Sequence, residues 1–120
     1  EQVKKDVTQG GAAIIKLRGR ASFQSPSYLS VEMIRSAMGG ETFRYPAGTY
    51  VKTDKYDHIM MAMNTTIDAT GCHYTVPEGT AEEIAKLDAS YAHLCKMRDE
   101  LVTLNIVPAI SEWSSINPNL

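Results

Sequence analysis

The sequence predicts an α+β domain, in which an antiparallel sheet of about five strands has one short and one long helix packed on one face. Three observations support this fold class: a long amphipathic segment with a helix-start signal, a shorter segment bounded by a proline and a glycine pair, and several stretches where apolar and polar residues alternate. We expect a single domain over residues 1–120, because this length suffices for one hydrophobic core.

The clearest element is a long helix over residues 80–104. Thr80 and Glu83 have the spacing of a capping box, in which each side chain accepts a backbone N–H of the other residue. The apolar residues that follow recur at steps of three and four: Ile84, Leu87, Tyr91, Leu94 and Leu101. This face widens toward its end, which suits packing on a sheet better than a narrow coiled-coil seam. We therefore expect this helix to cover the core.

A strand is predicted over residues 13–23, because its apolar and polar residues alternate. The apolar set would face inward and consists of Ile15, Leu17, Ala21 and Phe23. Lys16, Arg18 and Arg20 would then project together from the other face. Residues 1–11 are polar and end in a glycine pair, so we expect them to be flexible.

A short helix is predicted from Ser25-Pro26 to about Met38, with Gly39-Gly40 ending it. Its inward residues would be Leu29, Met33, Ile34 and Ala37. Short strands are expected at residues 42–45 and 49–53, and a final short strand at residues 106–107. Residues 111–120 would form a C-terminal tail packed through Trp113.

A β-hairpin is predicted where residues 56–67 meet the segment from Cys72 onward. Asp68 and Gly71 stand at the first and fourth positions of a type I turn. One face of this hairpin would be buried and would comprise Ile59, Met61, Met63, Ile67, Cys72, Tyr74 and Val76. Met60 and Ala62 would lie on the opposite face.

The composition is that of a soluble globular protein, with 43% hydrophobic residues, 22% charged residues and a mean hydropathy of −0.22. No run of about 18 apolar residues is present, so we expect no membrane span. A net charge of −2 gives no overall reason to expect a nucleic acid partner. The compartment stays open.

The most pointed functional feature is the predicted basic strand face. Its cations, with two from neighbouring elements, form the predicted ligand-binding set: Lys16, Arg18, Arg20, Arg35 and Arg44. Such a row of cations can bind phosphates or carboxylates. A sheet that binds RNA would also expose aromatic residues for stacking, whereas Phe23 is predicted inward. We therefore expect a non-catalytic module that forms homo-oligomers and recognises an anionic small molecule or a protein partner.

Two other functions stay open. A small enzyme could use His58 or His73 as general base beside Tyr56, Tyr74 or Asp57. A structural assembly subunit could associate through Met60 and Ala62, or through the long helix.

No metal site or cofactor is predicted. The chain has no Cys-x-x-Cys pair, and the adjacent Cys72 and His73 would point to opposite faces of a strand. Cys72 and Cys95 permit at most one disulfide, which the sequence leaves open.

Overall fold

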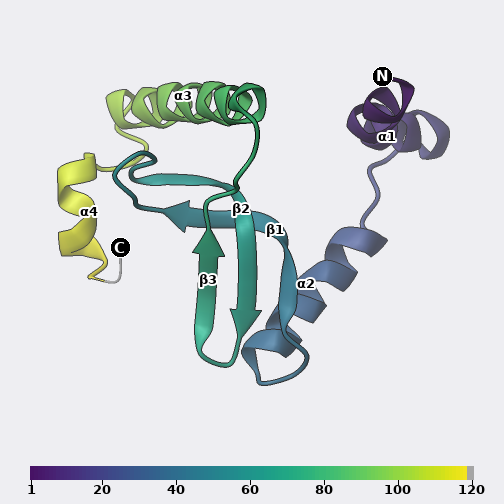
Figure 1. Cartoon of the computed structure of the whole chain (residues 1–120), viewed down its shortest axis with the longest axis horizontal. Coiled ribbons are helices and arrows are strands. Elements are labelled where there is room, and N and C mark those ends of the chain that lie inside the picture. The colour runs from purple at the N-terminus through teal and green to yellow at the C-terminus, as the bar shows by residue number, and fades with distance from the viewer. Residues whose placement is uncertain (119–120) are drawn as a thin grey trace. The chain divides into compact units, whose positions relative to one another are not determined.

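The fold is α+β, with four helices and one three-stranded antiparallel sheet in the computed structural model, which describes residues 1–118 (Figure 1). The sheet has the strand order β1-β2-β3. The elements are α1 (Gln2–Arg18), α2 (Gln24–Ala37), β1 (Phe43–Val51), β2 (Ile59–Asp68), β3 (Gly71–Thr75), α3 (Ala81–Thr103) and α4 (Ile110–Ile116). The prediction of about five strands and two helices is therefore wrong, although the α+β class holds.

The chain divides into two compact units. Unit 1 comprises residues 1–43 and 67–71, which are α1, α2 and the tip of the β2–β3 hairpin. Unit 2 comprises residues 44–66 and the chain from Cys72 onward, with most of the sheet, α3 and α4.

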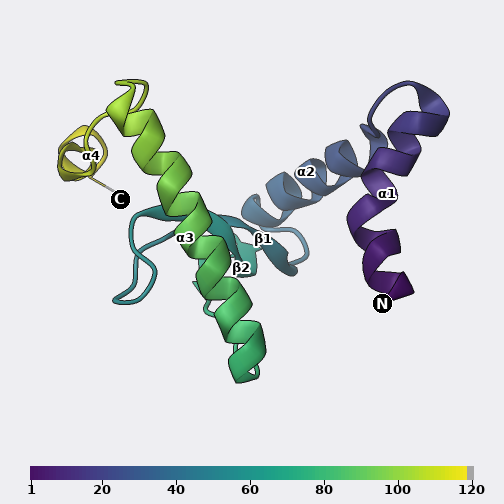
Figure 2. The same cartoon turned by 90° about the horizontal axis from the view of Figure 1, so that it is seen from above.

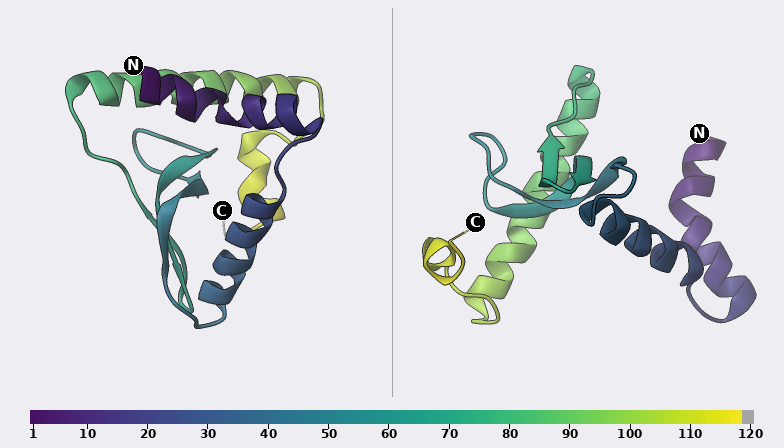
Figure 3. Two further views of the ribbon diagram at one scale, coloured as in Figure 1. Left: turned by 90° about the vertical axis from the view of Figure 1, so that its right-hand side faces the viewer. Right: turned by 90° about the horizontal axis from the view of Figure 1, so that it is seen from below.

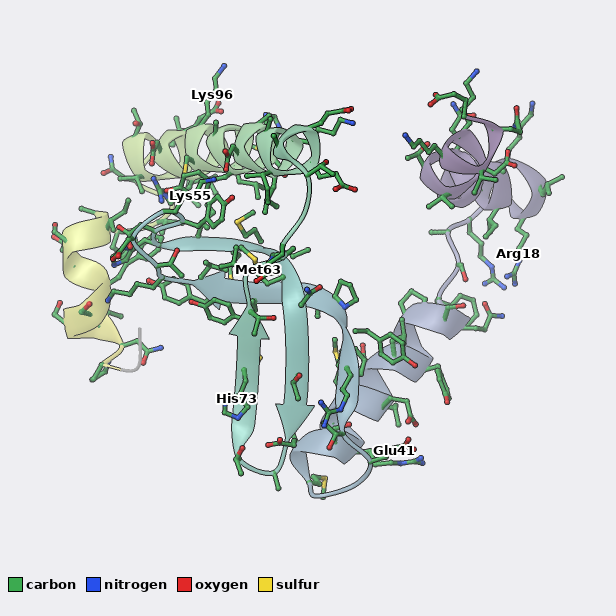
Figure 4. The ribbon with its side chains drawn as sticks, viewed as in Figure 1. Arg18, Glu41, Lys55, Met63, His73 and Lys96 are labelled. Atoms are coloured by element: carbon green, nitrogen blue, oxygen red, sulfur yellow. The ribbon has the colours of Figure 1, made fainter. Side chains whose placement is uncertain are left out.

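The hydrophobic core belongs to unit 2. Its buried members come from β1, β2 and the loop between them: Val51, Tyr56, Ile59, Met61 and Met63. Helix α3 lies across this face of the sheet (Figures 2 and 3) and packs Leu87, Tyr91, Leu94 and Cys95 against the core. Figure 4 shows Met63 on the side of the sheet that faces α3, whereas Lys96 projects from the far side of that helix. The predicted inward face of β2 and the role of the long helix are confirmed.

The β2–β3 hairpin is also confirmed, with its turn held by Asp68. Asp68 Oδ1 accepts the backbone N–H of Thr70 at 2.8 Å, and Gly71 has a φ of 129°, which favours glycine. The predicted burial of Cys72 and Val76 is wrong, since both residues are exposed. β3 is a short edge strand. Of its side chains, that of Tyr74 packs against the core, whereas that of Cys72, nearer the hairpin turn, does not.

The strand predicted at residues 13–23 is wrong, because this segment is the end of α1 and the start of α2. Helix α1 runs through Gly10-Gly11 and ends at Gly19, whose φ of 70° places it in the left-handed region. The N–H of Gly19 donates to Ile15 O at 2.8 Å and completes the cap. Residues 1–11, expected to be flexible, are thus mostly helical.

Two further predictions need correction. Residues 42–45 and 49–53 contribute to one strand, because β1 is an edge strand and tolerates Pro46, which has no N–H to donate. No strand forms at residues 106–107. The segment after Pro108 instead forms α4, where the indole N–H of Trp113 donates to Pro108 O at 2.9 Å.

Helix α3 begins with the predicted capping box. Thr80 Oγ1 accepts the N–H of Glu83 at 3.3 Å, and Glu83 Oε2 accepts the N–H of Thr80 at 2.9 Å. The pKa of Glu83 is lowered, first by the hydrogen bond from the Thr80 backbone N–H and then by the one that the Thr80 hydroxyl donates to Glu83 Oε2 at 2.9 Å.

Polar contacts hold α3 on the β1–β2 loop. The Tyr56 hydroxyl donates to Asp88 Oδ1 at 2.7 Å, and Lys55 Nζ lies 2.7 Å from the same oxygen. The Tyr91 hydroxyl accepts the Asp57 N–H at 3.1 Å. The hydrogen bond from Lys55, followed by the one from Tyr56, lowers the pKa of Asp88.

We expect Asp88 to contribute to the acid sensitivity of unit 2. A carboxyl whose pKa is lowered by folding stabilises the protein above its unfolded pKa of about 4, and this contribution is lost as the pH falls through the folded value. In the Asp88→Asn variant, the free energy of unfolding should therefore decrease less steeply as the pH falls below about 4. Urea titrations between neutral pH and about pH 3 measure this slope. Equal slopes for Asp88→Asn and the parent chain would contradict the expectation.

Candidate functional site

Exposed apolar side chains are concentrated in unit 1. Of the nineteen large apolar residues exposed in the described chain, eleven lie within residues 1–43. Helix α1 has no buried residue, and the only buried residue of α2 is Ser36. Unit 1 therefore has two amphipathic helices whose apolar side chains are mostly exposed, which is unusual for a folded segment.

Most of the large apolar residues of α1 lie in one narrow stripe, with Ile15 outside it. Its members recur at steps of four, three, four and three residues, and we name them the α1 seam: Val3, Val7, Gly10, Ile14 and Leu17. At 100° per residue they fall within an arc of about 80°. Val3, Val7 and Leu17 are 75%, 77% and 86% exposed. This spacing is the a/d pattern of a coiled coil.

The residue types along the α1 seam match that pattern at the a positions and at one of the three d positions. Val7 and Ile14 take the a positions, and Val3, Gly10 and Leu17 take the d positions. β-Branched residues at a with leucine at d favour a two-stranded parallel coiled coil. In that arrangement the flanking pairs are Asp6 with Gly11 and Ala13 with Arg18, so no like charges face each other.

In an isolated chain, the exposed α1 seam leaves helix α1 only marginally stable. Burying a valine, isoleucine or leucine side chain is worth about 1.5–3 kcal/mol. Each glycine inside a helix costs up to about 1 kcal/mol relative to alanine, and α1 has two of them at its centre. A helix of 17 residues with this composition is marginal by itself, so its stability depends on covering the seam.

The predicted basic row does not form. Lys16 and Arg18 lie in a helix, where residues two apart point about 160° away from each other. Arg18 donates to Gln24 Oε1 at 3.3 Å (Figure 4 shows Arg18 at the end of α1). Arg20 lies beyond the helix, with its guanidinium 5.0 Å from the centre of the Phe23 ring. The premise of one strand face carrying three cations is therefore wrong.

The other two predicted binding residues lie elsewhere. Arg35 in α2 pairs with Glu32 at 3.3 Å. Arg44 in β1 lines a cavity of about 190 Å³ in unit 2, together with residues of β2 and β3. Arg44 is thus the predicted binding residue that lines this cavity. Its role in binding stays a prediction.

The residues proposed for general base catalysis have separate structural partners. The Tyr56 hydroxyl donates to Asp88, and the Tyr74 hydroxyl accepts the Lys52 N–H at 3.1 Å. The His58 ring lies edge-on between Tyr50 and Trp113, with ring centres 6.2 Å away in both cases. His73 lies on the edge strand β3 (Figure 4). The role of His58 or His73 as a general base stays a prediction.

His58 Nδ1 lies 2.5 Å from Asp57 Oδ1, yet it makes no directed hydrogen bond. We regard this as a close contact between neighbouring residues in the chain.

Sequence reasoning missed the α1 seam, although its signal was present. Its members recur at steps of four and three residues over 15 residues of the sequence. The glycine pair interrupts this apolar pattern, and the alternation at residues 13–23 overlaps it and favours a strand.

No protein-family model matches the chain, and no curated protein matches it at a significant level. Within residues 1–118, no three His, Cys, Asp or Glu side chains group as metal ligands. No helix in that part of the chain combines the length and apolar character that a bilayer span requires. Cys72 and Cys95 are both free.

Proposed function

We propose that this chain is a non-catalytic assembly module that binds a second copy of itself through the α1 seam. The observation that supports this proposal is the uncovered a/d stripe of α1, whose residue types and flanking charges favour a parallel two-stranded coiled coil. A second copy supplies the same stripe, and two such stripes are self-complementary.

Self-association also explains why a glycine-containing helix with no buried residue is compatible with a folded chain. The apolar surface removed from water at the interface offsets the cost of ordering α1. The affinity of the dimer should be modest, because each copy contributes only four apolar side chains and one glycine to the interface. We therefore expect a reversible dimer with a dissociation constant in the micromolar to millimolar range.

The test is sedimentation equilibrium over a wide range of protein concentration, with circular dichroism on the same samples. The helical signal should rise as the dimer forms, because α1 is stabilised by association. Gly10→Leu fills the one gap in the seam and should lower the dissociation constant at least about tenfold, because each copy buries one more leucine.

The matched control is Gly11→Gln. It gives α1 a similar gain in helix propensity, but it lies beside the seam and adds no apolar group. It should tighten the dimer by less than about threefold. A chain that stays monomeric into the millimolar range, or an equal effect of both variants, would overturn the proposal.

A further inference from the structure

A cavity beside Arg44 has the features of a ligand-binding site, independently of self-association. It lies wholly within unit 2 and has a volume of about 190 Å³. By volume it has room for roughly six waters, or for one small polyatomic group. All three strands of the sheet line it, through Arg44, Tyr45, Pro46, Asn64, Thr65, Thr66 and Thr75.

Four of these side chains have unused hydrogen-bonding groups. Arg44, Asn64, Thr66 and Thr75 have no side-chain partner among residues 1–118. The hydroxyl of Thr65 is already committed, since it lies 3.0 Å from Met63 O and 3.3 Å from Ala47 O. The free set therefore offers a guanidinium fork, one amide and two hydroxyls.

The charge in this cavity has one sign. Arg44 supplies a fixed positive charge, and no Asp or Glu belongs to the lining. A cationic site with several neutral donors and no carboxylate selects an anion that accepts hydrogen bonds.

The site is held by a rigid part of the fold. Asn64 and Thr66 alternate along β2 with Met63 and Thr65, which are 1% and 3% exposed. Since neighbouring residues of a strand point to opposite faces, the core packing of Met63 and Thr65 fixes the direction of their neighbours.

We propose that the Arg44 cavity binds a phosphate group carried by a small molecule. A carboxylate has two oxygens, which the guanidinium fork alone can engage. A phosphate ester has further terminal oxygens, which the Asn64 amide and the hydroxyls of Thr66 and Thr75 can serve from the other two strands.

The experiment follows backbone amide shifts of the ¹⁵N-labelled full chain during titration with glycerol 3-phosphate, inorganic phosphate or acetate at constant ionic strength. Saturable shifts at residues 44–46, 64–66 and 75 are expected with both phosphates, in the millimolar range or tighter. Acetate should bind at least about tenfold more weakly, because it leaves the donors of β2 and β3 unused. Acetate that binds as well as phosphate would contradict the phosphate assignment.

Arg44→Gln should raise the dissociation constant for glycerol 3-phosphate at least about tenfold, since a charged hydrogen bond is lost. Thr66→Val keeps the side-chain shape and should raise it about threefold to tenfold. Arg35→Gln, which removes a cation already paired with Glu32, should change it by less than twofold. Equal weakening by the Arg35 and Arg44 variants, or no saturable shift with either phosphate, would overturn the proposal.

Discussion

Replacing Met63 by alanine should lower the free energy of unfolding of unit 2 by about 3 kcal/mol, within a range of about 2–5 kcal/mol. Met63 is 1% exposed and belongs to the buried cluster beneath α3. Truncation removes apolar contacts and leaves a cavity that close-packed neighbours fill only in part. Urea denaturation followed by the fluorescence of Trp113, the only tryptophan and a residue of unit 2, measures the change.

Met60→Ala provides the matched control for this experiment. Met60 lies on the same strand and is 59% exposed, on the face opposite to the core. Its truncation should change the free energy of unfolding by less than about 0.5 kcal/mol. If both methionine variants lost the same stability, the assignment of the buried face of β2 would be incorrect.

Replacing Ile14 by aspartate should weaken self-association roughly 100-fold or more. Ile14 takes an a position in the α1 seam, so a dimer would bury two such side chains. Losing about 1.5 kcal/mol or more from each copy corresponds to that factor, before the cost of burying a charge is added. Sedimentation equilibrium over the concentration range used for the parent chain measures the change.

Ile15→Asp introduces the same residue at the next position. Ile15 points about 120° away from the centre of the α1 seam and is 48% exposed. It should weaken the dimer by less than about fivefold, while the loss of intrinsic helix propensity is the same in both variants. Equal effects at Ile14 and Ile15 would show that helix stability, and not the seam, controls association.

Local signals predicted the long helix and the β2–β3 hairpin well. The Thr80–Glu83 capping box and the Asp68–Gly71 turn each depend on residues three apart in the chain, so their physics is contained in the sequence. The alternation of Met61 and Met63 with Met60 and Ala62 was equally informative, because a strand with one buried face must show it.

The same alternation misled at residues 13–23. Four apolar residues in steps of two fitted a strand, yet Ile14 and Leu17 also continued a stripe that starts at Val3. A glycine pair normally lowers helix propensity, so Gly10-Gly11 favoured an interruption where α1 is continuous. The prediction that Lys16, Arg18 and Arg20 form a row failed with the strand on which it depended.

Short-range periodicity and turn chemistry sufficed to predict the class of the fold, the main helix with its cap, the hairpin and the inward face of β2. Which amphipathic faces are covered is visible only in the folded chain. It buries the face of α3 on the sheet, leaves the α1 seam open, and brings Arg44 beside Asn64, Thr66 and Thr75. Such choices depend on contacts between residues far apart in the chain, and residue spacing carries no record of them.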